Sequence, residues 1–220
     1  MEASPLSGTL DLALGLQAAR LAGALHCTLE SAPPFGGRAP ERDPWRQIGD
    51  FISSPAVHDD LFGELIEPLR QVHARLEPLY ADPRSVPCGL IHNDIRPPNL
   101  LIDSAGEILA LLDFDDCAQT FLGYEFGALI GNFGKDEGRH VIMDRVLQLV
   151  SSYGTTRPLT DRERRCLPDL LIAHAGAEGI RVVSQWLAIG NTDVQLRDSY
   201  SVIQFLDLVA MRDGLAAALR

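Results

Sequence analysis

The sequence predicts a mainly α-helical domain that contains one small β-hairpin. Both flanks of the chain carry apolar residues at the three- and four-residue spacing of amphipathic helices. The centre has short apolar runs separated by turn residues, a pattern typical of strands. A chain of 220 residues, 46% of them hydrophobic, can also bury a sizeable core. We therefore expect a single domain over residues 1–220.

The N-terminal segment is expected to form a helix followed by a loop. Four leucines share one helical face between Leu10 and Leu25, and Ser7 or Thr9 would cap this helix. Prolines and glycines then crowd the segment from Ser31 to Pro44, which excludes regular structure there.

Further helices are expected on both sides of the centre. One region runs from Pro55 to Tyr80, with Ser54 as its cap and a break at Pro68. The chain after the centre forms a helical subdomain over about 121–220, and Thr160 begins a capping box there. Its helices are predicted at Phe121–Phe133, Gly138–Tyr153, Thr160–Ala188 and Val194–Leu219.

The centre, about 89–116, is expected to hold the hairpin. Leu90–Ile91, Leu100–Ile102 and Ile108–Leu112 are short apolar runs, and Ser104–Glu107 is a plausible hairpin turn. The hairpin would therefore join the second and third of these runs.

Charge and cysteine usage restrict the kind of protein. Nineteen basic and thirty acidic residues give a net charge of −11, which argues against nucleic-acid binding, and Lys135 is the single lysine. The four cysteines lie far apart without metal-site spacing, so we expect free thiols. No secretory leader or membrane span is predicted, and we expect a cytoplasmic protein.

Three polar side chains would meet at one end of the hairpin. Asp94 and Asn99 lie on the loop that enters the first strand, and Asp113 follows the second strand. Antiparallel pairing brings these ends together. Phosphoryl transfer needs a carboxylate that orients the attacking hydroxyl and oxygen ligands that hold Mg²⁺. The pattern therefore favours phosphoryl transfer over simple turn formation.

The motif His92-x-Asp94-x-x-x-x-Asn99, followed by Asp113-Phe114-Asp115, resembles the aminoglycoside phosphotransferase and choline kinase family, which has the protein-kinase fold. The resemblance implies that Asp94 is the catalytic base and that Asn99 and Asp113 bind Mg²⁺ and so contact ATP. It also implies that His92 supports the loop. We include Asp115 as a further candidate metal ligand.

The chain departs from the family pattern at several positions. Asn93 stands where the family usually has glycine, and Glu125 stands where an aspartate often begins the next helix. Lysine is absent before His92, and that region does not resemble the β-rich N-terminal lobe that holds the nucleotide phosphates. The resemblance therefore implies a kinase-like C-terminal lobe without its N-terminal lobe.

Several other side chains are candidates for lining a substrate cleft. Asp116 is expected to be solvated, and aromatic or acidic side chains of the helices would either line the cleft or belong to the core and surface. The aromatic candidates are Trp45, Trp186 and Tyr200, and the acidic ones are Glu178, Asp193, Asp198 and Asp207.

The resemblance implies ATP- and Mg²⁺-dependent phosphate transfer to a hydroxyl of a small molecule. The acceptor would be an aminoglycoside, a choline-like alcohol or a hydroxy-amino acid, and an acidic cleft would suit a cationic one. Without an N-terminal lobe, activity would need a longer native chain or a partner that supplies one. The alternatives are a non-catalytic, pseudokinase-like binding module and a homodimer that covers the exposed surface.

Overall fold

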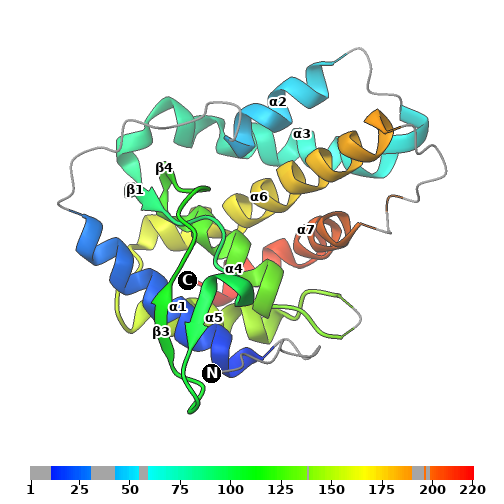
Figure 1. Ribbon diagram of the computed structural model, residues 1–220. Helices are drawn as coiled ribbons and strands as arrows, with labels where there is room; N and C mark the ends of the chain where they lie inside the picture. The colour runs from blue at the N-terminus through cyan, green and yellow to red at the C-terminus, as the bar shows by residue number, and fades with distance from the viewer. Residues whose placement is uncertain (1–10, 31–42, 55–58, 138, 190–195, 197–198) are drawn as a thin grey trace.

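The computed structural model describes residues 11–30, 43–54, 59–137, 139–189, 196 and 199–220 (Figure 1). Seven α-helices and two small sheets account for most of these residues. The helices are α1 (Leu12–Leu29), α2 (Pro44–Ser53), α3 (Asp59–Ala81), α4 (Glu125–Phe133), α5 (Met143–Gly154), α6 (Asp161–Ala188) and α7 (Tyr200–Ala218). The strands are β1 (Cys88–Ile91), β2 (Leu100–Ile102), β3 (Ile108–Leu111) and β4 (Ala118–Phe121), and short 3₁₀ turns lie at Pro83–Ser85, Pro97–Asn99 and Leu122–Tyr124.

The predicted hairpin is present. Strands β2 and β3 pair antiparallel, with Leu100 opposite Leu111. The Asp103 carboxylate accepts hydrogen bonds from the backbone N–H groups of Ala105 and Glu107, at 2.9 Å each, and so fixes the turn. Gly106 takes the left-handed φ of 83° that this turn requires.

The second sheet was not predicted. Strand β4 pairs antiparallel with β1, and Cys88 lies opposite Phe121. The sequence of β4, Ala118–Phe121, has no strong strand pattern, and its partner lies about thirty residues earlier in the chain. Long-range pairing rather than local preference therefore determines this strand.

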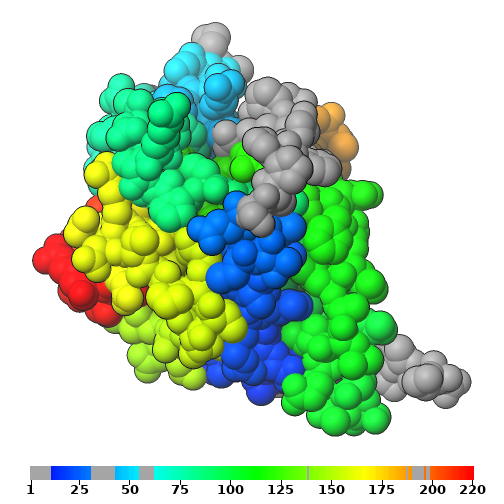
Figure 2. All heavy atoms as spheres, turned by 90° about the vertical axis from the view of Figure 1, so that its left-hand side faces the viewer, coloured from blue at the N-terminus to red at the C-terminus, as the bar shows by residue number. Residues whose placement is uncertain are grey.

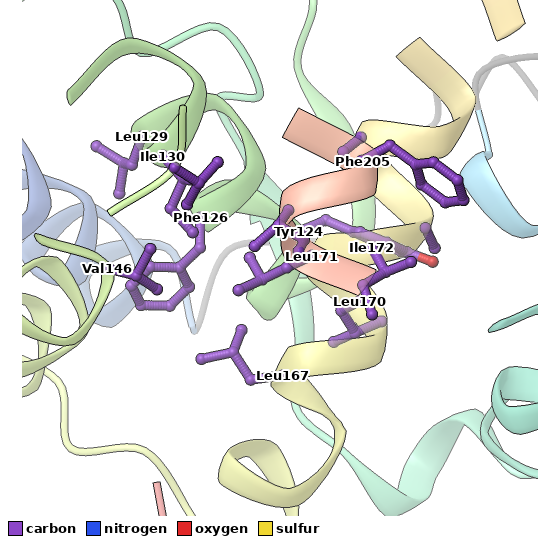
Figure 3. Close-up of a cluster of buried hydrophobic side chains, with 14 of the residues drawn as sticks. Tyr124, Phe126, Leu129, Ile130, Val146, Leu167, Leu170, Leu171, Ile172 and Phe205 are labelled. Carbon is purple, nitrogen blue, oxygen red and sulfur yellow. The ribbon is translucent and has the colours of Figure 1, made fainter. Parts of the chain in front are cut away.

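The core lies where α4 and α6 pass each other and meet α5 and α7. Figure 3 shows Phe126, Leu129 and Ile130 of α4 among the apolar side chains of the neighbouring helices. All three are fully buried. Helix α4 is buried almost all round, so its first residue and the loop before it are held against a rigid body.

Helix α1 packs through small residues. Alanines and glycines make up most of its buried face, and a Cβ on Gly15 would lie 2.5 Å from the Phe133 side chain. Gln17 joins the helix to the hairpin, because its side chain bonds the backbone of Gly106 and Ile108. Figure 2 shows the outer face of α1 between the hairpin region and the start of α6. By length and composition alone α1 could cross a membrane, but seven of its residues are buried in this protein.

The N-terminal caps differ from the prediction. Asp11 caps α1, and its carboxylate accepts hydrogen bonds from the N–H groups of Ala13 and Leu14. Ser7 and Thr9 lie outside the described residues. Ser54 ends α2 rather than beginning α3, and the helix α2 itself was missed.

Pro68 does not break α3. The helix continues through Pro68 and Pro78 to Ala81. Its residues on both sides of Pro68, including Leu65, Leu69 and Val72, are buried along one face. Packing of this continuous face outweighs the one hydrogen bond that the proline cannot donate.

The region before α5 is not helical, although a helix was expected from Gly138. Lys135 and Val141 form an isolated antiparallel bridge instead. The Asp136 N–H donates to the carbonyl of His140 at 2.9 Å, and the Ile142 N–H donates to the carbonyl of Gly134 at 2.9 Å. We call Lys135–Glu137 and Arg139–Val141 together the bridged segment. In contrast, the predicted capping box of α6 is confirmed by reciprocal bonds between Thr160 and Glu163.

Candidate active site

Asp94 and Asn99 are brought into contact by the loop that joins β1 to β2, which we call the 92–99 loop. The Asn99 Nδ2 group donates to Asp94 Oδ2 at 2.8 Å and to the Asp94 carbonyl at 2.9 Å. Asn99 is buried, whereas Asp94 is partly exposed. The Asp94 carboxylate is thus fixed from behind and still faces solvent.

Arg96 adds a positive charge beside this carboxylate. Its Nε atom lies 2.9 Å from Asp94 Oδ2, and the two side chains are 47% and 24% exposed. An exposed ion pair of this kind contributes little to stability. Its effect is instead local, because it places the guanidinium against one oxygen of Asp94 beside the cavity described below.

His92 joins the 92–99 loop to the end of β3. Its Nε2 atom lies 3.0 Å from the carbonyl of Leu112, and its Nδ1 atom accepts a hydrogen bond from the Asp94 N–H at 3.3 Å. Phe114 packs edge-on against the imidazole, with ring centroids 4.7 Å apart. The His92 ring is therefore a spacer between the loop and the segment that follows β3.

Asp113 lies directly after the point where the two segments meet. The Leu112 N–H donates to the Asn99 carbonyl at 2.8 Å, so the backbones of Asp113 and Asn99 are adjacent. Asp113 has a left-handed backbone with φ of 63°. The backbone at Asp113 therefore lies next to Asn99, which contacts Asp94, and the Asp113 side chain is exposed. Asp115 is exposed, and nothing in the described residues joins it to this group.

Glu125 holds the 92–99 loop through hydrogen bonds to its backbone. Its fully buried carboxylate accepts the N–H groups of His92, at 2.6 Å, and of Asn93, at 2.8 Å. Asn93 has a φ of 65°, and this left-handed turn lets two successive N–H groups face one carboxylate. Asparagine tolerates that conformation better than other residues with a Cβ. It therefore fits where the family usually has glycine.

The support of Glu125 extends into a buried polar network. His26 of α1 lies 3.3 Å from Glu125 through Nε2 and 2.8 Å from the Tyr153 hydroxyl through Nδ1. The Arg157 guanidinium donates to the same hydroxyl at 3.2 Å and to Glu163 at 2.8 Å. Burial raises the pKa of Tyr153, so its hydroxyl stays protonated. No local sequence pattern indicates that His26 and Glu125 touch, because they lie on different helices.

A cavity of about 760 Å³ opens in front of Asp94. It is bounded by the 92–99 loop, α4, the bridged segment, α6 and the start of α7. Asp94, Arg96, Lys135, Arg139, His174 and Glu178 are among its lining residues. The space is in the size range of sites for small organic molecules.

The residues considered for the cleft are only partly found there. Glu178 and Tyr200 line the cavity, and so does Asp116, which was expected to be solvated. Trp45 instead stacks between His73 and Tyr80. Trp186 packs against the core, and Asp207 bonds the bridged segment, while Asp193 and Asp198 lie outside the described residues.

The ligand chemistry near Asp113 fits Mg²⁺. The amide nitrogen of Asn99 is used by Asp94, and within the described residues its Oδ1 atom accepts no hydrogen bond. A carboxylate from Asp113 would complete a pair of oxygen ligands, and Mg²⁺ commonly keeps waters and substrate phosphates for the rest. No cluster of three His, Cys, Asp or Glu side chains suited to a metal occurs in the described part of the chain.

The sequence matches the family described as "Phosphotransferase enzyme family" over residues 2–164. It is similar to the homoserine kinase of Chelativorans sp. (strain BNC1), with 26% identity over 168 residues that cover 75% of this chain and 50% of that one. The homoserine kinase of Gluconobacter oxydans (strain 621H) is 24% identical over 161 residues, 73% of this chain and 50% of that one. The chain thus spans about half the length of these curated relatives.

Solved structures agree in fold. A microcompartment-associated aminopropanol kinase superposes with a TM-score of 0.61 at 21% identity, covering 99% of this chain and 66% of that one. A choline/ethanolamine kinase family protein from Mesorhizobium loti has a TM-score of 0.63 at 17% identity, covering 100% and 76%. The fold is therefore the mainly α-helical, kinase-like one, and no β-rich lobe precedes β1 in the described residues. Because the family match covers well over half of the sequence, the chain belongs to the phosphotransferase enzyme family.

Proposed function

We propose that this protein transfers the γ-phosphoryl group of ATP to a hydroxyl group of a small molecule. The observation that supports this most is the position of Asp94, which lines the cavity and is joined to Asn99 and, through the hairpin, to Asp113. An acceptor hydroxyl in the cavity would meet a carboxylate that is already oriented.

In the proposed reaction the acceptor oxygen attacks the γ-phosphorus. A new oxygen–phosphorus bond forms while the bond between this phosphorus and the β,γ-bridging oxygen breaks, and ADP leaves. Asp94 receives the hydroxyl proton, and His92 and Glu125 hold the loop in place. Asn99 and Asp113, with Asp115 as a further candidate, would hold Mg²⁺, which when bound neutralises charge on the phosphates.

Amino alcohols and hydroxy-amino acids are the acceptors we favour. The curated relatives named above are homoserine kinases, and the solved neighbours are named for aminopropanol and choline or ethanolamine. We place the protein in the cytoplasm, where ATP is available and where its four free cysteines stay reduced. Because the described residues include no β-rich lobe, we expect weak ATP binding unless a further segment or a partner supplies that lobe.

The test is phosphate transfer from Mg²⁺-ATP to a panel of amino alcohols and hydroxy-amino acids. Asp94→Asn should lower kcat by about 10²- to 10⁴-fold, since it removes the proton acceptor and keeps the shape. Asp82→Asn removes one carboxylate from an exposed position and should leave kcat unchanged. Full activity of Asp94→Asn would contradict the proposal. Acceptor binding without any turnover would favour the binding-module alternative.

A further inference from the structure

Lys135 is a buried cation without a partner in the described residues. It is the single lysine of the chain, it is 6% exposed, and it lines the cavity. Its ammonium group donates no hydrogen bond and joins no ion pair within the part of the chain that the structure describes. Because Lys135 lines the cavity and makes no such contact with the described residues, its ammonium group is available there to an anionic group of a ligand.

Two carboxylates near Lys135, those of Asp207 and Asp136, hydrogen-bond the backbone of the bridged segment. Asp207 of α7 lies close enough to raise the pKa of Lys135, but its carboxylate already accepts the Val141 N–H at 2.8 Å and faces His140 at 3.2 Å. Asp136 accepts the His140 N–H at 2.9 Å. Both carboxylates therefore hold the bridged segment together.

Two other acids of the cavity pair with arginines, and Asp116 and Glu137 also line it. Asp94 lies 2.9 Å from Arg96, and Glu178 lies 2.6 Å from Arg181. The bridged segment contributes two cations, Lys135 and Arg139, and two acids, Asp136 and Glu137, to the lining.

Arg139 places a second cation on the bridged segment. Its guanidinium carbon lies 3.7 Å from the ring centroid of Tyr200, which also lines the cavity. Stacking of this kind orients an arginine and leaves its N–H groups available. Arg145 anchors the segment from the other side by donating to the Lys135 carbonyl. Two cations are thus presented from one fixed backbone.

Two glycines of α4 line the cavity together with Lys135. Gly127, Gly131 and Lys135 follow one another at four-residue spacing, and all three line the cavity. The Nδ1 atom of His174 is buried there without a hydrogen-bond partner in the described residues, and burial lowers the pKa of this ring. This nitrogen packs closely on Gly127, because a Cβ there would lie 2.3 Å from it.

We propose that Lys135 and Arg139 bind a carboxylate of the acceptor while its hydroxyl group faces Asp94. The cavity then selects hydroxy acids, including hydroxy-amino acids, over alcohols that lack an anionic group. This inference rests on the proposed phosphotransfer and adds the acceptor class and the residue that determines it.

The test compares L-homoserine with two four-carbon compounds that each differ from it at one group: 4-hydroxybutanoate lacks the amine, and 2-amino-1,4-butanediol has a hydroxymethyl group in place of the carboxylate. Binding to the whole chain is measured by calorimetry, without nucleotide. The first two carry a carboxylate, and we expect them to bind about tenfold or more tightly than the diol, as a charge-assisted contact implies.

Lys135→Met should weaken binding of both carboxylates by about 10- to 100-fold and leave the diol unchanged. Lys135→Arg should restore most of the affinity. Arg165→Met, which removes one positive charge from an exposed position on α6, is the matched control and should bind like the wild type. Circular dichroism verifies that each variant is folded.

The proposal is overturned if the wild type does not prefer carboxylates, if it binds none of the three compounds, or if Lys135→Met weakens all three equally. It is also overturned if inorganic phosphate binds in a Lys135-dependent way more tightly than 4-hydroxybutanoate, because the anion would then be a phosphate. Failure of the proposed phosphotransfer is seen separately, as transfer that does not depend on Asp94.

Discussion

Glu125 is the residue on which the geometry of the 92–99 loop depends most. It is fully buried, and it satisfies two successive backbone N–H groups and one nitrogen of His26. Bonds from a carboxylate to backbone N–H groups are stronger than neutral ones, and their loss leaves buried donors unpaired. Glu125 is therefore a positioning residue that acts on Asp94 through the backbone.

We expect Glu125→Ala to lower the free energy of unfolding by about 2–5 kcal/mol, because two buried N–H groups lose their acceptor. Chemical denaturation measures this loss. Glu125→Gln keeps one oxygen acceptor and should lose less. A fall of under about 1 kcal/mol in the alanine variant would show that water replaces the carboxylate at the loop.

Lys135 offers a second prediction, which concerns pH. Burial lowers its pKa to about 8, with Asp207 opposing and Arg139 reinforcing the shift. Between that value and 10.5, its ordinary pKa, the unfolded chain binds a proton that the folded chain releases. The free energy of unfolding of the wild type should therefore rise with pH in this window, relative to a variant without the lysine.

Lys135→Met should accordingly be the more stable protein at pH 7, by about 1–3 kcal/mol. The difference should shrink as the pH rises from 8 toward 10.5. Paired denaturation curves at several pH values measure it, and the titrations of Cys166 and Tyr153 cancel because both proteins share them. If the difference in the free energy of unfolding did not change with pH, the charge of Lys135 would already be compensated in the folded protein.

At the scale of elements, Gly127 allows α4 to pack closely against α6. A Cβ on Gly127 would lie 2.2 Å from the His174 ring, which packs directly on this glycine. We expect Gly127→Ala to lower the free energy of unfolding by about 1–3 kcal/mol through overpacking, and to narrow the cavity. Thermal denaturation measures the change.

Gly63 of α3 is the matched control. It is also helical, but a Cβ there meets nothing within 4 Å. Gly63→Ala should raise the free energy of unfolding by about 0.5–1 kcal/mol, because alanine favours the helix. Destabilisation of both variants to the same extent would contradict the role given to the contact between Gly127 and His174.

The elements also show where the sequence is informative. Periodic leucines, the Thr160 capping box and the hairpin turn were predictable because their determinants lie within a few residues. Strand β4 and the continuity of α3 through Pro68 were not, because each depends on a distant packing partner. In the site, too, only local features were predictable: the spacing of Asp94 and Asn99 predicts that these two residues lie close together.

At the scale of the whole molecule, tertiary packing brings together residues that lie outside the sequence motif. His26 comes from α1, Glu125 from α4 and Tyr153 from α5, and they meet under one loop. Lys135 and Asp94 line one cavity although some forty residues separate them in the chain. Such residues have no local signal, so only the folded arrangement identifies them.

The hairpin leaves apolar side chains uncovered on the described part of the molecule. Leu109 is 64% exposed, and Leu101, Leu112 and Phe114 are each close to half exposed. Soluble monomers rarely expose such clusters without a use. A further segment, a partner that supplies the second lobe and a second copy of the chain remain the occupants we propose for this face.

Because the chain has a single lysine, that side chain can be labelled selectively. Apart from the terminal amine, amine-directed reagents find one target in 220 residues, and that target lines the cavity. Reductive methylation with ¹³C-formaldehyde would therefore place a single side-chain NMR reporter in the cavity without any mutation. The chemical shift of that methyl group would follow the arrival of any small molecule beside it.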